Sequence, residues 1–131
     1  MTSKQKKPEK MMTEVELELM KVVWSLGACT VKDVQNSLAE VRELAYTSVA
    51  TMLKILEQKG FLKSEKTERA IIYTARVEKS EYEQTSLGHL KEQIFEGDPS
   101  SMVARMLDDS DLSREELEGL RALLNRRLKE K

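Results

Sequence analysis

Two helices are predicted near the start of the chain by apolar residues at helical spacing. Thr13 and Glu16 have the spacing of a capping box, in which the hydroxyl accepts one free backbone N–H and the acid reaches back to another. Thr30 and Asp33 repeat this pattern before a second segment, and Gly27 predicts the end of the first. The residues expected to face the core are Val15, Leu19, Val22, Val23 and Leu26 in the first helix and Val31, Val34, Leu38 and Val41 in the second.

A third helix is predicted within residues 44–60, "LAYTSVATMLKILEQKG", and its two faces differ in kind. Charged residues make up 34% of the chain, yet the polar face of this helix is small, hydroxylated and almost free of acids until Glu57. The apolar stripe is Ala45, Val49, Met52, Leu53 and Leu56, and the opposite face carries Thr47, Ser48, Ala50, Thr51 and Lys54.

Two strand-like segments follow the third helix. "FLKSEK" and "AIIYTARV" are extended in pattern, and the second is rich in β-branched and aromatic residues. Residues 67–70, "TERA", lie between them as the expected tip of a hairpin. The order of three helices and two strands predicts a winged helix-turn-helix domain, a mostly α fold with a small β-hairpin. Many proteins with different functions share this architecture.

From Glu78 onward the pattern is helical and polar. Three segments, "EYEQTSLGHLKEQIF", "PSSMVARML" and "REELEGLRALLNRRLKEK", each follow a helix-start signal. These signals are Ser80 with Glu83, Asp98 before Pro99, and Ser113 with Glu116. We therefore divide the chain into a flexible basic tail at 1–11, a winged-helix domain at 12–77 and a helical region at 78–131.

The C-terminal helical region holds too few large apolar residues for a core of its own. Segments of this size rarely fold alone without disulfides, a metal or a partner, and no cysteine follows Cys29. We expect a second copy of the chain to supply the missing surface across a two-fold axis. The residues expected to form this dimer are Leu87, Leu90, Ile94, Met102, Val103, Met106, Leu107, Leu117, Leu120, Leu124 and Leu128.

Charge and composition limit the classes of protein to which the chain can belong. The net charge is −1, but residues 1–77 carry thirteen Lys or Arg against ten Asp or Glu, whereas residues 78–131 carry nine against thirteen. A mildly basic first half and an acidic second half indicate two roles. Acids interrupt the segment behind the basic start, so no signal peptide is predicted. No apolar run approaches the length of a membrane span, and we expect a cytoplasmic protein with no direct membrane insertion.

The hydroxylated face of the third helix fits the major groove of DNA. A groove floor can approach small side chains closely, and Thr47, Ser48 and Thr51 can contact base edges, phosphates or thymine methyl groups. Tyr46 and Lys54 can reach phosphates from the rims. The alternative for this helix alone is an ordinary polar surface helix, and the surrounding helix and hairpin order favours DNA.

The helix start and the hairpin tip add two weaker indications. Ala45 occupies the expected cap position and has no capping oxygen, so several N–H groups and a partial positive charge are left for an anion such as a DNA phosphate. Arg69 lies at the hairpin tip, where a basic residue can reach the DNA backbone or minor groove. An ordinary solvated turn is an equal alternative for the tip, since Glu65 and Glu68 dilute its charge.

The chain resembles the penicillinase and methicillin-resistance repressors, the BlaI/MecI family, which also includes copper-responsive repressors. The resemblance lies in "MTEVELELMKVVWSLGACTVKDVQNSLAE", "AYTSVATMLKILEQKGFLKSEK" and "MVARMLDDSDLSREELEGLRALLN", and it runs from about Met12 to about Arg126. It implies a homodimeric repressor whose winged helices bind a palindromic operator and whose C-terminal helices hold the dimer. In the antibiotic-responsive branch, it also implies a membrane sensor protease that triggers cleavage in the C-terminal region.

Two departures from the family pattern concern regulation. The copper branch carries a C-terminal Cys-x-Cys pattern, whereas this chain has no cysteine after Cys29, which argues against copper sensing of that kind. The protease-regulated members are cut at an Asn-Phe bond, and the matching positions here are Arg105 and Met106. The route of derepression therefore stays open at this point.

Three functions remain to be compared. The first is a dimeric, sequence-specific DNA-binding repressor, and the second is a winged-helix module for protein–protein contact. The third is a small enzyme that uses Cys29, but we expect Cys29 to be a buried apolar residue, with Trp24 in the core and His89 on a helix surface. One Cys and one His provide no metal ligand set, and no Gly-rich phosphate loop is present. We therefore predict no catalytic residues, no metal and no cofactor.

Overall fold

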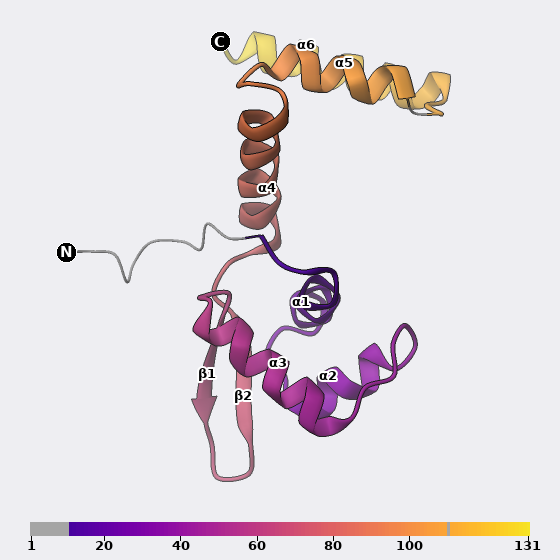
Figure 1. The fold of residues 1–131 in the computed structure, drawn as a ribbon. Helices are drawn as coiled ribbons and strands as arrows, with labels where there is room; N and C mark the ends of the chain where they lie inside the picture. The colour runs from indigo at the N-terminus through magenta and orange to yellow at the C-terminus, as the bar shows by residue number, and fades with distance from the viewer. Residues whose placement is uncertain (1–10, 110) are drawn as a thin grey trace, which may run out of the picture. The chain divides into compact units, whose positions relative to one another are not determined.

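The computed structural model describes residues 11–109 and 111–131, which fall into two compact units (Figure 1). The first unit ends at Leu87 and the second begins at Gly88. Apart from Met11, the predicted basic tail lies outside the described residues. No helix in the described part of the chain is long and apolar enough to cross a membrane.

Three helices open the first unit, and their starts follow the sequence pattern. They are α1 (Glu14–Leu26), α2 (Val31–Leu38) and α3 (Tyr46–Gln58). Both predicted capping boxes are confirmed. The Thr13 hydroxyl accepts from the backbone N–H of Glu16 at 3.2 Å, and the Glu16 carboxylate accepts from the backbone N–H of Thr13 at 2.9 Å. Thr30 and Asp33 form the same two bonds at 3.1 and 2.9 Å. Gly27 ends α1 with φ of 80°, a left-handed conformation that favours glycine.

A two-stranded antiparallel hairpin completes the winged helix. Its strands are β1 (Leu62–Lys66) and β2 (Ile71–Ala75). Leu62 lies opposite Ala75. Cys29, from the α1–α2 connection, forms an isolated antiparallel bridge with Tyr73, with backbone N···O distances of 3.0 and 2.7 Å. The predicted order of three helices and two strands is therefore confirmed.

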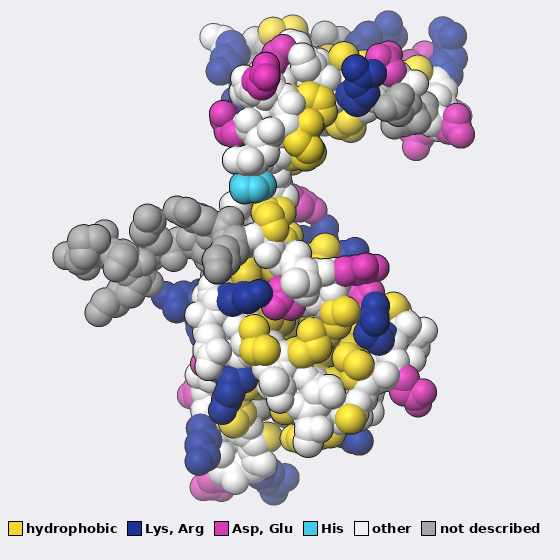
Figure 2. All heavy atoms as spheres, viewed as in Figure 1, with side chains coloured by type: hydrophobic (Ala, Val, Ile, Leu, Met, Phe, Trp, Pro, Cys, Tyr) yellow, Lys and Arg dark blue, Asp and Glu magenta, His cyan; other side chains and the backbone are white. Residues whose placement is uncertain are grey.

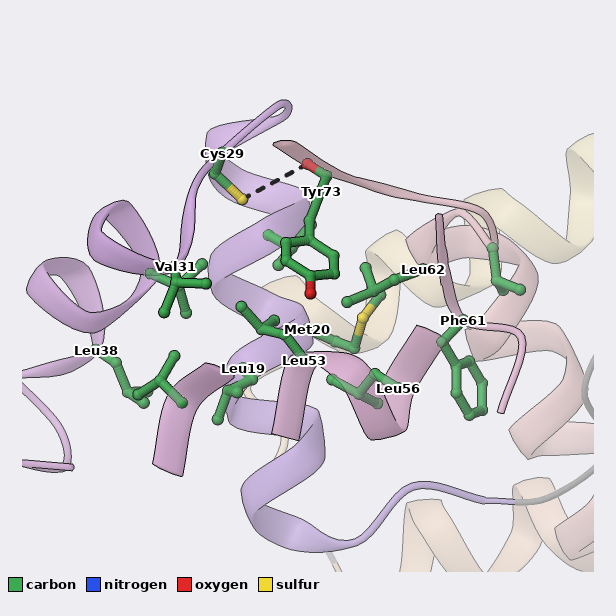
Figure 3. Close-up of a cluster of buried hydrophobic side chains, with 14 of the residues drawn as sticks. Leu19, Met20, Cys29, Val31, Leu38, Leu53, Leu56, Phe61, Leu62 and Tyr73 are labelled. Atoms are coloured by element: carbon green, nitrogen blue, oxygen red, sulfur yellow. Dashed lines mark hydrogen bonds between the residues drawn. The ribbon is translucent and has the colours of Figure 1, made fainter. Parts of the chain in front are cut away.

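One core joins these five elements (Figure 3). The Tyr73 ring lies among Met20, Leu53 and Leu62, so the hairpin packs directly on α1 and α3. The buried core residues are Leu19, Met20, Val23, Cys29, Val31, Val34, Leu38, Val49, Leu53, Leu56, Phe61, Leu62, Tyr73, Val77 and Tyr82.

Two residues predicted to face the core are exposed instead. Leu26 is 45% exposed because it is the last residue of α1, beyond the part of the helix that other elements cover. Val41 is 73% exposed because α2 ends at Leu38 and a turn follows. Val41 was predicted to face inward from the helical spacing of the residues before it. That spacing no longer applies at Val41, because the residue lies beyond the end of the helix.

Helix α4 (Lys79–Ile94) begins earlier than predicted. The expected capping box of Ser80 with Glu83 is wrong. Glu81 accepts from the backbone N–H of Glu78 at 2.9 Å, while Glu83 pairs with Lys79 at 2.6 Å. Because acids stand at both 81 and 83, either could cap a helix start, and the chain uses the earlier one.

Two further helices follow in the second unit. They are α5 (Pro99–Asp109) and α6 (Arg114–Lys129). Asp98 caps α5 as predicted, because its carboxylate accepts from the Ser101 hydroxyl at 2.7 Å and the Ser100 backbone N–H at 3.0 Å. These bonds hold the pKa of Asp98 below its usual value. The capping box of Ser113 with Glu116 is also confirmed. None of the described side chains from residue 88 onward is buried.

An ion pair between Glu16 and Lys59 ties the start of α1 to the end of α3. The two charged groups lie 2.7 Å apart, and the Glu16 side chain is 8% exposed. Although burial raises the pKa of Glu16, the hydrogen bonds from Lys59 and Thr13 outweigh it and hold that pKa below the usual value of 4.5.

The Glu16 pair predicts a specific loss of stability in acid. A folded-state pKa below 4.5 means that the pair stabilises the fold above about pH 4.5, and that this contribution is lost as the pH falls through the lowered value. Glu16→Gln should cost about 1–2 kcal/mol at pH 7, less than a fully buried pair because Lys59 keeps contact with solvent. Urea unfolding at pH 7 and at a series of pH values below 4.5 should show the difference from the wild type shrink as the pH falls.

The exposed pair of Lys79 with Glu83 provides the control for this experiment. Both of its side chains are more than half exposed, so Glu83→Gln should change the unfolding free energy at pH 7 by no more than about 0.5 kcal/mol. An equal effect of the two substitutions would contradict a special role for the Glu16 pair.

Candidate nucleic-acid interface

Helix α3 presents two faces, as its sequence predicts. Of the predicted apolar stripe, Val49, Leu53 and Leu56 are fully buried against the core and Met52 is partly buried. Ala45 is exposed, because it is the N-cap residue before the first turn of the helix. The opposite face is solvent-exposed at Thr47 and Thr51, among others. The core therefore holds the helix in place by one side and leaves the other side available to a ligand. All five α3 residues predicted to contact DNA are exposed: Tyr46, Thr47, Ser48, Thr51 and Lys54.

The start of α3 has no side-chain cap. Ala45 occupies the N-cap position in an extended conformation, and no side chain accepts a hydrogen bond from the first turn there. The helices α1, α2 and α6 all begin with capping boxes. The first turn of α3 contains no acid. Its N–H groups and the positive end of the helix dipole can therefore interact with an external anion.

A hollow of about 510 Å³ lies beside the first half of α3. Thr47, Ser48 and Thr51 line one side of it, and we call it the α3 hollow. Its remaining lining residues are Val15, Arg42, Leu44 and Met52. Figure 2 shows hydrophobic side chains at the surface between α1 and α3, with charged side chains around them. The hollow therefore brings together three of the predicted contact residues.

Arg42 is a lining residue that sequence analysis did not single out. Its Nε and Nη2 donate to the two carboxylate oxygens of Glu18 at 2.7 and 3.2 Å. A guanidinium has five N–H donors, so this bidentate pair fixes the group and leaves donors for another acceptor. The hydrogen bonds from Arg42 hold the pKa of Glu18 below its usual value. The contact joins residues 24 positions apart, and no local sequence pattern indicates it.

The wing tip positions Arg69 at the surface. Thr67 closes the turn, because its hydroxyl donates to the Ala70 carbonyl at 2.7 Å and accepts from the Ala70 backbone N–H at 3.1 Å. Arg69 is exposed, and Lys and Arg side chains gather with acidic ones around the end of the wing (Figure 2). Arg69 does not line the α3 hollow.

Cys29, Trp24 and His89 lie as the sequence predicts, except that Trp24 is only partly buried. Burial, with a smaller effect of Asp33, raises the pKa of the Cys29 thiol to about 11, which disfavours the reactive thiolate. Trp24 packs against the core, and its indole N–H donates to the Val77 carbonyl at 2.9 Å. His89 is exposed on α4. No group of His, Cys, Asp and Glu among the described residues has an arrangement that could hold a metal ion.

Comparisons with known proteins place this geometry in a family. The profile of the penicillinase repressor family matches residues 12–126. The penicillinase repressor of Bacillus licheniformis is 30% identical over 112 residues, which cover 86% of this chain and 88% of that protein. The methicillin resistance regulatory protein MecI of Mammaliicoccus sciuri is 24% identical over 115 residues, which cover 88% of this chain and 94% of that protein.

Two solved structures extend the likeness to the fold. The solution structure of the DNA-binding domain of the repressor BlaI matches with a TM-score of 0.52 and 30% identity, and it covers 59% of this chain and 94% of that chain. The monomeric form of Bacillus licheniformis BlaI in complex with the blaP half-operator matches with a TM-score of 0.50, at the same identity and coverage.

The family match confirms the resemblance that the sequence analysis identified. The family consists of DNA-binding repressors, which agrees with the prediction that the chain is not an enzyme. A winged-helix module used only for protein–protein contact is not favoured by these relatives. The chain belongs to the penicillinase repressor family, the BlaI/MecI family of DNA-binding transcriptional repressors.

Proposed function

We propose that the chain represses transcription as a homodimer that lays one α3 helix in the major groove of each half of a palindromic operator. The observation that carries this proposal is the exposed, hydroxylated face of α3 opposite three fully buried residues, Val49, Leu53 and Leu56. Small side chains let the groove floor approach, so that Thr47, Ser48 and Thr51 meet base edges.

Phosphate contacts complete the proposed interface. Tyr46 and Lys54 extend from α3 toward the flanking backbones, and Arg69 extends from the wing. The uncapped start of α3 and the guanidinium of Arg42 provide further N–H donors for a phosphate. A gel shift on the DNA upstream of the chain's own gene tests the proposal. We expect salt-dependent, sequence-selective binding, and a chain that binds no DNA would support the protein–protein alternative.

Thr51→Ala should relax base preference. Thr51 is exposed at the centre of the polar face of α3, so the substitution removes a hydroxyl and a methyl group without disturbing the core. We expect discrimination at one base position in each half-site to fall by about 1 kcal/mol or more. Titrations on operator duplexes with single-base changes measure this. Unchanged selectivity in Thr51→Ala, and likewise in Thr47→Ala, would contradict the assignment of this face to base contacts.

Lys54→Ala should weaken binding to every DNA sequence alike. A lysine that contacts only phosphate displaces counterions from DNA but does not discriminate between bases. Its loss should therefore reduce the slope of log affinity against log salt concentration by about one per half-site. Affinities measured at several salt concentrations on operator and non-operator DNA test this. A change in selectivity with an unchanged slope would place Lys54 at a base edge instead.

The proposed dimer rests on exposed apolar side chains in the C-terminal part of the chain. Leu90, Ile94, Leu124 and Leu128 are each at least 39% exposed, and no described side chain from residue 88 onward is buried. Figure 2 shows hydrophobic side chains at the surface of the second unit. Burial of these faces against a second copy would provide the core that the segment lacks.

Derepression by cleavage requires a local change in α5. Arg105 and Met106, at the family cleavage position, lie within this helix. A peptide bond in a helix has its backbone groups hydrogen-bonded within the helix, so a protease must first unwind the segment. None of the described α5 side chains is buried, and so little packing within the chain opposes unwinding. We include a membrane sensor protease in this proposal as the partner that triggers the cut.

A further inference from the structure

Three aromatic rings meet at the start of α4, with Tyr82 between the other two. The Tyr82 ring centroid lies 6.1 Å from that of Trp24 and 5.8 Å from that of Phe61, which it meets edge-on at 80°. Tyr82 is 9% exposed, and within α4, whose residues are all described, it alone is buried. Tyr82 is therefore the main point at which α4 is anchored to the winged unit.

Hydrogen bonds fix these rings in place. The Tyr82 hydroxyl accepts from the backbone N–H of Met12 at 2.8 Å, just before α1. The Trp24 indole N–H donates to the Val77 carbonyl at 2.9 Å, just before α4. The Val77 backbone N–H in turn donates to the Phe61 carbonyl at 3.4 Å. The segments that enter α1 and α4 are thus tied to the same aromatic cluster.

The cluster also contacts the end of the DNA-binding helix. Phe61 follows α3 closely, and its backbone N–H donates to the carbonyl of Leu56, a buried α3 residue, at 3.0 Å. Phe61 itself is 1% exposed. Two buried residues, Phe61 and Tyr82, therefore connect the end of α3 with the first turns of α4. Neither of them lines the α3 hollow.

We propose that Tyr82 is a positioning residue for operator binding, which anchors the first turns of α4 on the winged unit and thereby sets the spacing of the two α3 helices in the dimer. This inference rests on the proposed function, because α4 carries three of the predicted dimer residues after Tyr82. From Tyr82 onward α4 continues as one helix to Ile94, so the anchor and these dimer residues belong to the same helix.

If Tyr82 has this role, its loss weakens binding to paired half-sites but not binding to a single half-site. Loss of a purely structural residue would weaken both together. Loss of the Tyr82 anchor leaves the exposed face of α3 intact, so binding of one winged unit to one half-site is retained. The second half-site is then found less readily, because the linked unit no longer arrives at a fixed spacing and the effective concentration falls. The penalty for altered operator spacing shrinks for the same reason.

The experiment uses the full chain and DNA that the wild-type chain selects from random sequence. Duplexes are compared with the selected half-site spacing, with one base pair added or removed, and with a single half-site. We expect the wild type to lose about 10-fold or more on changed spacing. Tyr82→Leu should bind the selected spacing about 10-fold more weakly, discriminate spacings by no more than about threefold, and bind the single half-site within about twofold of the wild type.

Two further variants at this position distinguish a loss of positioning from a folding defect. Tyr82→Met fills the same space with a flexible chain and should behave like Tyr82→Leu if the rigid ring is what positions α4. Tyr82→Phe keeps both ring contacts, loses only the Met12 bond, and should retain most of the spacing discrimination. If Tyr82→Leu and Tyr82→Met both keep the wild-type spacing penalty, or lose half-site and full-site affinity by one common factor, the positioning role is overturned.

Sedimentation of the wild-type chain distinguishes this inference from the function on which it rests. A monomeric wild type, or one that binds single and paired half-sites equally well, overturns the proposed dimer. A dimeric, spacing-sensitive wild type whose Tyr82 variants are equally spacing-sensitive leaves the dimer standing and overturns the role of Tyr82 alone.

Discussion

A chain truncated after Ala104 is expected to be monomeric, to keep a folded winged unit and to lose operator affinity by about 10²-fold or more. The truncation removes α6 and the second half of α5, which together carry six of the eleven predicted dimer residues. The core of the winged unit lies wholly between Leu19 and Tyr82 and loses none of its members. Affinity falls because one winged helix buries little DNA surface, whereas two joined units make the second half-site contact intramolecular.

Sedimentation and operator titration of the truncated chain test this expectation side by side. A matched pair of full-length variants separates dimerisation from mere loss of length. Leu124→Lys places a charge in the leucine stripe of α6 and should weaken the dimer and the operator complex together. Ala122→Lys adds the same charge two residues away, outside that stripe, and should change neither strongly. A truncated chain that stays dimeric, or binds as tightly as the full chain, would refute the proposed clamp and the account of derepression that depends on it.

The helix starts of this protein were predictable because they depend on neighbours in sequence. Thr13 with Glu16, and Ser113 with Glu116, meet across a single turn, so the residue types and their spacing suffice. The two faces of α3 were predictable for the same reason, since periodicity alone decides which residues share a side. The winged-helix order then followed from the sequence of elements.

The wrong predictions concern positions where tertiary contacts or a competing local signal determine the structure. Val41 continued the apolar period of α2, but the helix ended three residues earlier and left it exposed. Ser80 with Glu83 matched the capping pattern, yet Glu81 bonds the backbone of Glu78 and starts the helix sooner. Periodicity does not report where a helix stops, and a motif does not exclude a competing one nearby.

In the candidate site, too, only features that depend on neighbouring residues were predictable from the sequence. The exposed hydroxyls of α3 were found from one segment. Arg42 was missed because its place beside the α3 hollow depends on Glu18, in another helix. The anchoring of α4 was missed as well, since Tyr82 meets Trp24 and Phe61 only after the whole winged unit has folded. Contacts between residues far apart in sequence set the geometry of the interface, and a single sequence does not reveal them.

The largest loss of stability is expected from Leu53→Ala. Leu53 is fully buried at the middle of α3, where α1 and the hairpin also contribute to the core (Figure 3). Its truncation removes buried apolar surface and leaves a cavity that a core built from several elements closes only in part. We expect a cost of about 2–5 kcal/mol, a large fraction of the roughly 5–15 kcal/mol that stabilises a typical domain.

Ile55→Ala provides the matched control for Leu53→Ala. It lies two residues further along the same helix, loses a side chain of the same composition and is 37% exposed. Because water already reaches this side chain, its truncation should cost well under half as much as that of Leu53. Urea unfolding followed by circular dichroism measures both free energies. Similar costs for the two variants would mean that α3 is not held by its predicted apolar face, and that its hydroxylated face is not fixed toward DNA by the core beneath it.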